Sequence, residues 1–242
     1  MEFRKSVQTD VVFFLLDAFN VFNLITVLFS FGICHVLARY IYEATHYDLI
    51  LNISNPVLQF TVLFVIVDLK NYFSHFLFHK YQSLWRLHEF HHSATEFCML
   101  TRYRGHFLEV ALKRFIDVIP FAIFGASIES YFIIKAMSEI HQIALHSGYK
   151  SDWGWIGKFI LVSPAAHWIH HSVDKMHYDK NFGNTFIVWD RLFRTYHPAE
   201  KKIELGVTDN AYNQRGVVKD VVIGYRNFFT SLFKGKSTDR IS

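Results

Sequence analysis

Cysteine and charge are both scarce in this chain of 242 residues. Its two cysteines, Cys34 and Cys98, are too few for a disulfide scaffold or a thiolate zinc site, so both are expected to be reduced and structural. Charged residues make up 19% of the sequence, against about 25% in an ordinary soluble domain. A cleavable signal sequence is not expected, because the first apolar stretch carries Asp17, Asn20 and Asn23 and has no small-residue cleavage pattern.

Apolar and aromatic residues are abundant instead. The sequence is 51% hydrophobic and 18% aromatic, and Phe alone occurs 26 times. The stretch 11–33 has the ~20 residues that a membrane-crossing helix needs, and the stretch 56–67 is too short alone but continues as a helix through His75 and His79. The alternative is a set of buried core helices in a soluble all-α protein. We predict an all-α, polytopic membrane bundle of about four transmembrane helices, based on the stretches 11–33, 56–67, 107–124 and 128–145.

The positions of Lys and Arg predict the orientation. The net charge is +4. If the N-terminus is cytosolic and each stretch crosses in turn, the outer segments are 40–56 and the tight turn at 125–127, and neither contains Lys or Arg. This obeys the positive-inside rule, with Arg39 as the one exception. The histidine-rich segments then form a cytosolic cap on a multi-pass protein of the bacterial inner membrane or the endoplasmic reticulum.

Histidine is the residue type that stands out. There are 15 histidines, and 12 of them lie between His75 and His177. They include two H-x-x-H-H triplets, and residues three and four apart share one face of a helix. Imidazole suits iron, zinc, copper and nickel, and these groups supply enough nitrogens for two metal ions. The expected ligands are His75, His79, His88, His91, His92, His146, His167, His170 and His171, with His141 less certain.

His141 and His146 are five residues apart, which places their side chains about 140° apart around a straight helix. We therefore favour His146 as the ligand, with Gln142 one turn before it. A helical bulge near Ile143 would bring in both histidines. The histidines at 35, 46 and 197 lie outside the cluster and are expected to be structural or exposed.

Metal-bound histidines usually donate their second ring N–H to an acid or a carbonyl. Asp68 is the first candidate for such a partner, because an unpaired acid after an apolar run would be costly. Each acid could equally be a solvated residue or a helix cap. His106 and His177 are expected either to support the ligands or to face the substrate. The expected supporting residues are Asp68, Tyr72, His106, Asp174, His177 and Asp190.

Residues 68–94 resemble the fatty acid hydroxylase superfamily, which includes sterol desaturases, methylsterol oxidases and alkylglycerol monooxygenase. The family patterns D-x3-Y-x2-H-x3-H and L-W-R-x-H-x-x-H-H-S are both matched here. Later blocks also match: R-x-H-x-x-E at 104–109, H-x-x-H-H at 167–171, and N-F-G and W-D-x-L-F near residues 181–193. The resemblance covers about residues 60–196. The sequence departs from the family pattern at Phe76, Phe107 and Arg194, none of which is an expected ligand.

The resemblance implies an integral membrane enzyme that uses molecular oxygen at a histidine-bound centre of two irons, with zinc possible in the isolated protein. It would hydroxylate, or less often desaturate, an unactivated C–H bond of a lipid taken from the bilayer. Electrons would come from a cytochrome b5-like or ferredoxin-like donor. The expected regions are an N-terminal transmembrane region (1–55), a catalytic domain (56–197) and a basic cytosolic tail (198–242).

The same residues disfavour four other functions. A haem-binding electron-transfer subunit usually needs histidine pairs on opposed helices. A non-catalytic lipid-binding relative is disfavoured because every histidine box is complete. A zinc hydrolase of the H-E-x-x-H type is not indicated, because His88 and Glu89 are followed by Phe90 and His91. A nucleic-acid partner is not expected, because the aromatic residues lie in apolar runs.

Overall fold

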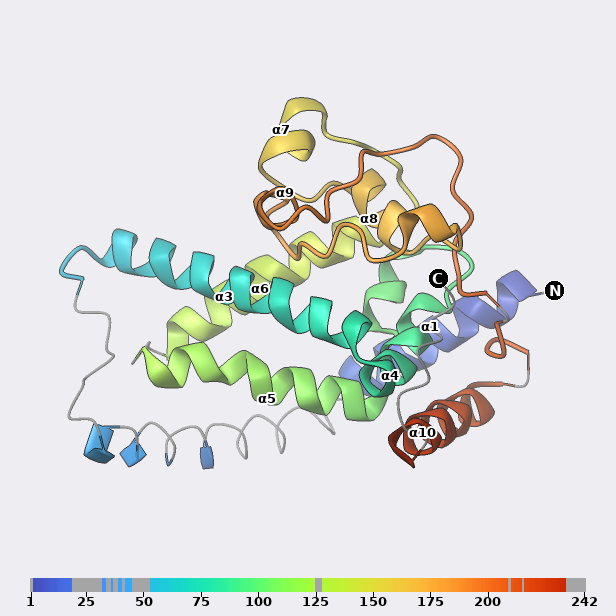
Figure 1. Cartoon of the computed structure of the whole chain (residues 1–242), viewed down its shortest axis with the longest axis horizontal. Helices are drawn as coiled ribbons and strands as arrows, with labels where there is room; N and C mark the ends of the chain where they lie inside the picture. The colour runs from blue at the N-terminus through green and yellow to red at the C-terminus, as the bar shows by residue number, and fades with distance from the viewer. Residues whose placement is uncertain are drawn as a thin grey trace.

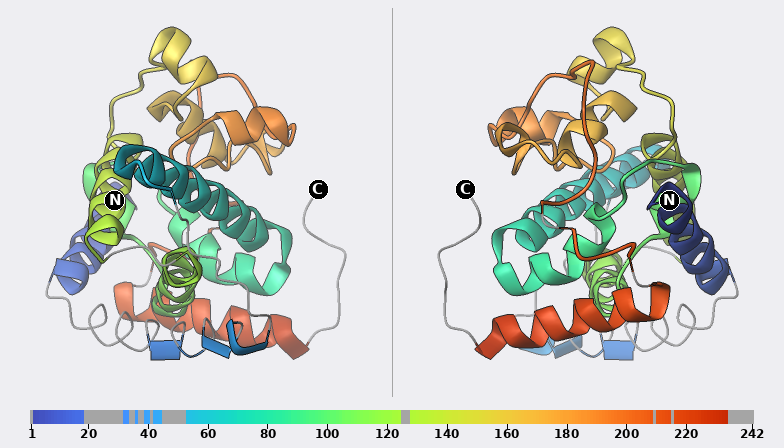
Figure 2. Two further views of the ribbon diagram at one scale, coloured as in Figure 1. Left: turned by 90° about the vertical axis from the view of Figure 1, so that its left-hand side faces the viewer. Right: turned by 90° about the vertical axis from the view of Figure 1, so that its right-hand side faces the viewer.

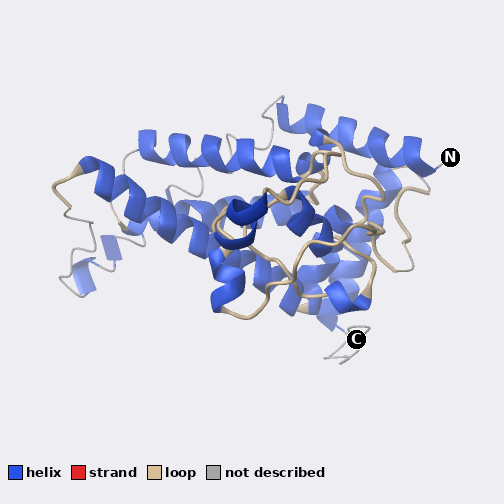
Figure 3. Cartoon of the chain, turned by 90° about the horizontal axis from the view of Figure 1, so that it is seen from above, coloured by secondary structure: helices blue, strands red, loops and turns tan. Residues whose placement is uncertain are grey.

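The computed structural model consists of helices joined by loops (Figure 1, Figure 3). It describes residues 2–18, 53–124, 128–208, 210–214 and 216–233, with a few positions between 32 and 44. These described residues contain no strand and only two isolated β-bridges, which confirms the all-α prediction for them. The elements are α1 (Glu2–Ala18), α3 (Pro56–Lys80), α4 (Gln82–His92), η1 (Met99–Tyr103), α5 (Phe107–Ile123), α6 (Ile128–Leu145), α7 (Gly154–Phe159), α8 (Pro164–His170), η2 (Lys175–His177), α9 (Val188–Leu192) and α10 (Val217–Phe233).

Helix α3 is fixed at its start by local sequence. The Asn55 side-chain oxygen accepts hydrogen bonds from the backbone N–H groups of Val57 and Leu58, at 3.0 and 3.1 Å, and Pro56 occupies the first helical position. The helix has 25 residues, or about 37 Å at 1.5 Å per residue, which exceeds a hydrocarbon core of ~30 Å. Among the described residues, α3 is the one helix long and apolar enough to cross a membrane.

Helices α5 and α6 also follow the sequence prediction closely. They cover Phe107–Ile123 and Ile128–Leu145, where apolar stretches at 107–124 and 128–145 were expected. The predicted turn between them lies outside the described residues. Helices α3 and α5 run along the longest axis of the molecule, and α6 lies beside them (Figure 1). The three helices share a buried core formed by Leu63, Val67, Val118, Phe121, Tyr131 and Ile134.

The number of membrane crossings stays a prediction. The first expected crossing, 11–33, begins in α1, and most of it lies outside the described residues. Helices α5 and α6 carry several charged residues that pair with one another or with neighbouring helices. The cytosolic position of the histidines likewise rests on the distribution of Lys and Arg along the sequence.

Helix α10 lies across the long axis of the molecule and packs against α4 (Figure 2). Phe90 of α4 packs with Phe13 of α1 and with Tyr212, which precedes α10. Gly224 lets α10 approach closely, because a Cβ atom there would lie 2.6 Å from the His106 ring. Residues 217–233, which were expected to belong to a basic tail, are thus part of the packed body of the protein.

Candidate metal centre

Four helices bring the histidine boxes to one place. His75 and His79 lie one turn apart near the end of α3, and the first H-x-x-H-H triplet closes α4. His146 directly follows α6, and the second triplet lies on α8 and the residue after it. Because each box presents its rings on one helix face, packing these helix ends together gathers the rings from all four elements.

The first group contains five rings, and their ligand nitrogens all lie within 4.8 Å of one another. The Nε2 atoms of His75 and His88 are 3.0 Å apart, and those of His79 and His92 are 3.2 Å apart. The ring of His170 faces His75 and His79, with centroid separations of 4.4 and 4.7 Å. Five imidazole nitrogens therefore point into one small volume, contributed by α3, α4 and α8.

The second group contains four buried rings under the same distance limit. The Nε2 atom of His146 lies 3.1 Å from Nε2 of His91 and 3.1 Å from Nε2 of His167. His171 completes the group and stacks on His92 of the first group at a centroid distance of 4.1 Å. The two groups are thus direct neighbours.

Backbone carbonyls fix the orientation of four of these nine rings. The Nδ1 atom of His75 contacts the Phe182 carbonyl at 2.9 Å, and those of His91, His146 and His170 contact other carbonyls at 2.8 Å. A carbonyl can only accept a hydrogen bond, so each Nδ1 carries the proton and each Nε2 keeps a free lone pair. This arrangement is typical of metal-bound histidines.

One ring is held by a buried acid that the sequence analysis did not single out as a partner. Glu109 of α5 contacts Nδ1 of His88 at 2.7 Å, and its side chain is 3% exposed. Glu109 is the acid of the R-x-H-x-x-E block, so the family pattern contained a sequence signal for this residue. Arg104 of the same block is fully buried, pairs with Asp10 of α1 at 2.6 Å, and supplies the carbonyl that holds His91.

The chemistry of the two groups fits a bound metal ion in each. Four buried ring nitrogens have no hydrogen-bond partner, and an unpaired buried polar atom is costly. Burial lowers the pKa of the expected ligand histidines outside α3 well below 6.5, with neighbouring charges adding to the effect, so these rings are neutral and able to ligate. The unpaired nitrogens are Nδ1 of His167, Nε2 of His170, and both nitrogens of His171.

The structure does not bring His141 into either group. Helix α6 is described as a continuous α-helix through Leu145, so the five-residue spacing turns the two rings apart. The ring of His141 instead packs against Trp153 at a centroid distance of 5.6 Å. The preference for His146 agrees with this geometry, and the bulge that would have included His141 is not found.

The acids chosen from the sequence have a different role from the expected one. Both oxygens of Asp68 accept hydrogen bonds from Thr185 N–H, Phe186 N–H and the Trp189 indole, at 2.9 to 3.0 Å. Asp190 likewise accepts from the backbone of residues 182 and 183 and from the Thr195 hydroxyl. These carboxylates hold the loop around residues 182–189 in place, and the loop carbonyl of Phe182 in turn holds a ligand ring.

The remaining expected supporting residues also contact groups other than the ligand rings. The Tyr72 hydroxyl pairs with Thr195 at 2.9 Å, and Asp174 caps η2 through Met176 N–H. His106 caps α5 and lies 3.3 Å from the Val221 carbonyl of α10. His177 pairs with Ser172 and lies in a separate cluster.

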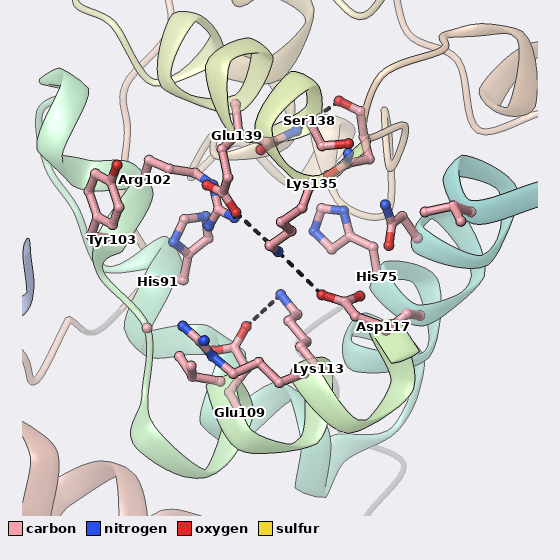
Figure 4. A pocket seen from close by; sticks show the side chains of 18 of the residues that line it. His75, His91, Arg102, Tyr103, Glu109, Lys113, Asp117, Lys135, Ser138 and Glu139 are labelled. Atoms are coloured by element: carbon pink, nitrogen blue, oxygen red, sulfur yellow. Dashed lines mark hydrogen bonds and ion pairs between the residues drawn. The ribbon is translucent and has the colours of Figure 1, made fainter. Parts of the chain in front are cut away.

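A cavity of about 570 Å³ adjoins the histidine groups, between α3, η1, α5 and α6. Four of the histidines line it, together with apolar residues such as Val67, Phe121 and Ile134. Figure 4 shows Lys135 of α6 reaching between Glu139 and Asp117, at 3.1 and 3.3 Å. Most charged side chains of the cavity wall are thus paired with each other, and the cavity gives access to His75, His88, His91 and His167 of the two groups.

The model of the fatty acid hydroxylase family matches residues 60–195, which is more than half of the chain and includes every ring of both groups. The chain belongs to the fatty acid hydroxylase family. Within the described residues, the complete histidine boxes of this family thus converge on two neighbouring groups.

Three curated relatives show the range of this family. The chain is 29% identical to ornithine lipid hydroxylase OlsE of Rhizobium tropici over 60% of its own length and 44% of that protein. It is 27% identical to human alkylglycerol monooxygenase over 71% of its length and 38% of that protein. It is 28% identical to methylsterol monooxygenase 1-2 of Arabidopsis thaliana over 57% of its length and 46% of that protein. The chain therefore spans less than half the length of these relatives, and no solved structure matches it.

Proposed function

We propose that this protein is a membrane-bound, oxygen-dependent di-iron enzyme that hydroxylates an unactivated C–H bond of a lipid. The observation that carries the proposal is the convergence of nine imidazoles into two neighbouring groups beside a cavity of about 570 Å³. The relatives named above are hydroxylases and monooxygenases, which favours hydroxylation over desaturation.

The histidines would hold the irons, five rings at one and four at the other. When bound, the two irons supply the oxygen activation that no protein side chain provides. The chain's own residues keep the ring nitrogens free for coordination through the carbonyls and Glu109, and they exclude water by burying the rings.

The substrate would be a sterol, a fatty acyl lipid or a related lipid that enters from the bilayer into the cavity. Hydroxylation of R–H to R–OH consumes one molecule of oxygen, two electrons and two protons, and releases one water. We propose a cytochrome b5-like or ferredoxin-like donor for the electrons, docking on the cytosolic side of an integral membrane protein.

The metal content of detergent-purified protein tests this function. We expect about two irons per chain from cells grown with iron, and incorporation of labelled oxygen into a lipid product. His91→Ala and His170→Ala should each abolish metal loading and product, with little loss of membrane insertion. One haem iron with a Soret band would instead indicate electron transfer, and metal-free folded protein would overturn the proposal.

A further inference from the structure

A third cluster of possible metal ligands lies apart from the two histidine groups. It consists of His177 at the end of η2, and of His197 and Glu200 in the loop after α9. Their ligand atoms all lie within 4.8 Å of one another. We propose that these three residues form a separate zinc site, which clamps the loop after α9 onto η2.

The distances suit a zinc ion. Zinc bonds of about 2.0–2.2 Å in a tetrahedral site place the ligand atoms roughly 3.3–3.5 Å apart. Nε2 of His177 lies 3.4 Å from Oε1 of Glu200, and Nε2 of His197 lies 3.9 Å from the same oxygen. The Glu200 side chain is 44% exposed, so a small rotation of this side chain is enough to shorten the longer distance.

The ring nitrogens that face the acid are the ones able to ligate. Nδ1 of His197 lies 2.9 Å from the Pro198 carbonyl, so it carries the proton and Nε2 keeps its lone pair. Nδ1 of His177 is held at 2.9 Å by the Ser172 hydroxyl, which turns Nε2 toward Glu200. Each imidazole therefore has the supporting contact that metal-bound histidines usually have.

Hydrogen bonds from a buried side chain hold the backbone of His197 in place. Asn181 is fully buried, and its side chain accepts from His197 N–H at 2.8 Å and donates to the His197 carbonyl at 2.9 Å. The same amide donates to the Ala166 carbonyl of α8 at 2.9 Å. His197 is thus fixed relative to the helix that carries the second histidine triplet, while His177 is 3% exposed.

The donor set selects the class of metal. Two imidazoles and one carboxylate are typical of zinc and of similar transition metals, whereas calcium and magnesium prefer oxygen ligands. A pocket of about 650 Å³ next to His177 is lined by Lys150, Lys201 and Lys202. The pocket leaves room beside His177 for a water molecule as the further ligand of the metal.

Metal counting on the full-length, detergent-purified protein tests the site. The protein is equilibrated with zinc sulfate, dialysed, and measured by mass spectrometry for metal per chain. Glu200→Gln and His197→Ala should each carry one metal equivalent fewer than the wild type. Both variants should still elute as folded protein and keep the metals of the two histidine groups. Glu204→Gln, an exposed acid four residues away, should match the wild type.

Equal metal counts in the wild type and in both variants would overturn the site, because the three side chains would then be in contact without holding a metal. The count also separates this proposal from the proposed function. If the two histidine groups hold no metal, the wild type would carry one equivalent and the two variants none. The zinc site would then stand while the di-iron function fails.

Discussion

Glu109 contacts Nδ1 of His88 at 2.7 Å, while Lys113 contacts the same carboxylate oxygen at 2.6 Å. The acid is buried, so its negative charge increases the basicity of the ring that would bind metal. Such a contact orients the ring and fixes its proton on the side away from the metal. Glu109 is therefore expected to affect metal affinity without ligating.

We expect Glu109→Gln to weaken metal binding about 10- to 100-fold, because the amide has the same size but no charge. A competition titration against a chromophoric chelator measures the change. Glu96→Gln, which replaces an exposed acid in the loop after α4, is the control and should bind as the wild type does. Unchanged affinity in Glu109→Gln would show that the His88 ring needs no charged partner.

His141 and His146 offer a second comparison of single residues. His146 lies in the second group, whereas His141 packs on Trp153 outside both groups. We expect His141→Ala to retain the metals of both groups and His146→Ala to abolish their loading, as is expected of His91→Ala in the same group. Metal analysis of the two purified variants measures this, and loss of metal in His141→Ala would place a ligand where the structure shows a packing residue.

The grouping of the expected ligand histidines could be predicted from the sequence because each box is local. The spacings of His88, His91 and His92 fix a shared helix face whatever the rest of the fold does. The supporting partners could not be predicted in the same way, because most are backbone carbonyls, such as those of Arg104 and Lys180, and these have no residue-type signature. Asp68 was chosen for its position after an apolar run, but its carboxylate accepts hydrogen bonds from three donors that lie more than 100 residues away, on a loop and on α9.

At the scale of elements, residues close in sequence determine where the long helices begin and end. Asn55 and Pro56 start α3, and apolar stretches set the length of α5 and α6. The conformation of the loop from residue 178 to residue 187 is not determined by neighbouring residues in this way. Asp179 and Asn181 adopt positive φ angles of 58° and 54°, and the loop is held by contacts to α3 and α9 that only the folded chain brings together.

Asp68 is the anchor of that loop on α3, so we expect Asp68→Asn to destabilise the protein by about 1–3 kcal/mol. The amide keeps the shape but replaces one of the two accepting oxygens with an NH2 group, which faces N–H donors and cannot accept from them. Denaturation of the detergent-solubilised protein measures the loss. Asp174→Asn is the control, because the exposed asparagine can still cap η2. Equal stability of Asp68→Asn and wild type would contradict the anchoring role.

At the scale of the whole molecule, the buried imidazoles make the metal-free protein sensitive to acid. Burial lowers the pKa of the seven histidines of the two groups that lie outside α3 well below 6.5 in the folded state, whereas the unfolded chain binds protons near 6.5. Below that pH the unfolded state holds more protons than the folded state, so the free energy of unfolding decreases as pH falls.

We therefore expect the Tm of chelator-treated protein to change little above about pH 7 and to fall steadily between about pH 6.5 and pH 5. Metal-loaded protein should resist this fall until the metal is released, because bound nitrogens do not take up protons. Thermal scans of both forms across this range measure the effect. A flat profile for the metal-free form would mean that its rings are already charged or solvated.

His91 and His92 are consecutive residues, yet they face different groups, and the same is true of His170 and His171. A rotation of α4 or of the end of α8 therefore moves one donor of each group at the same time. An ion in one group would set the helix positions that the other group needs, so a second ion would meet a partly organised site. We therefore expect the loading of the two groups to be cooperative, with protein that carries a single ion as a minor species.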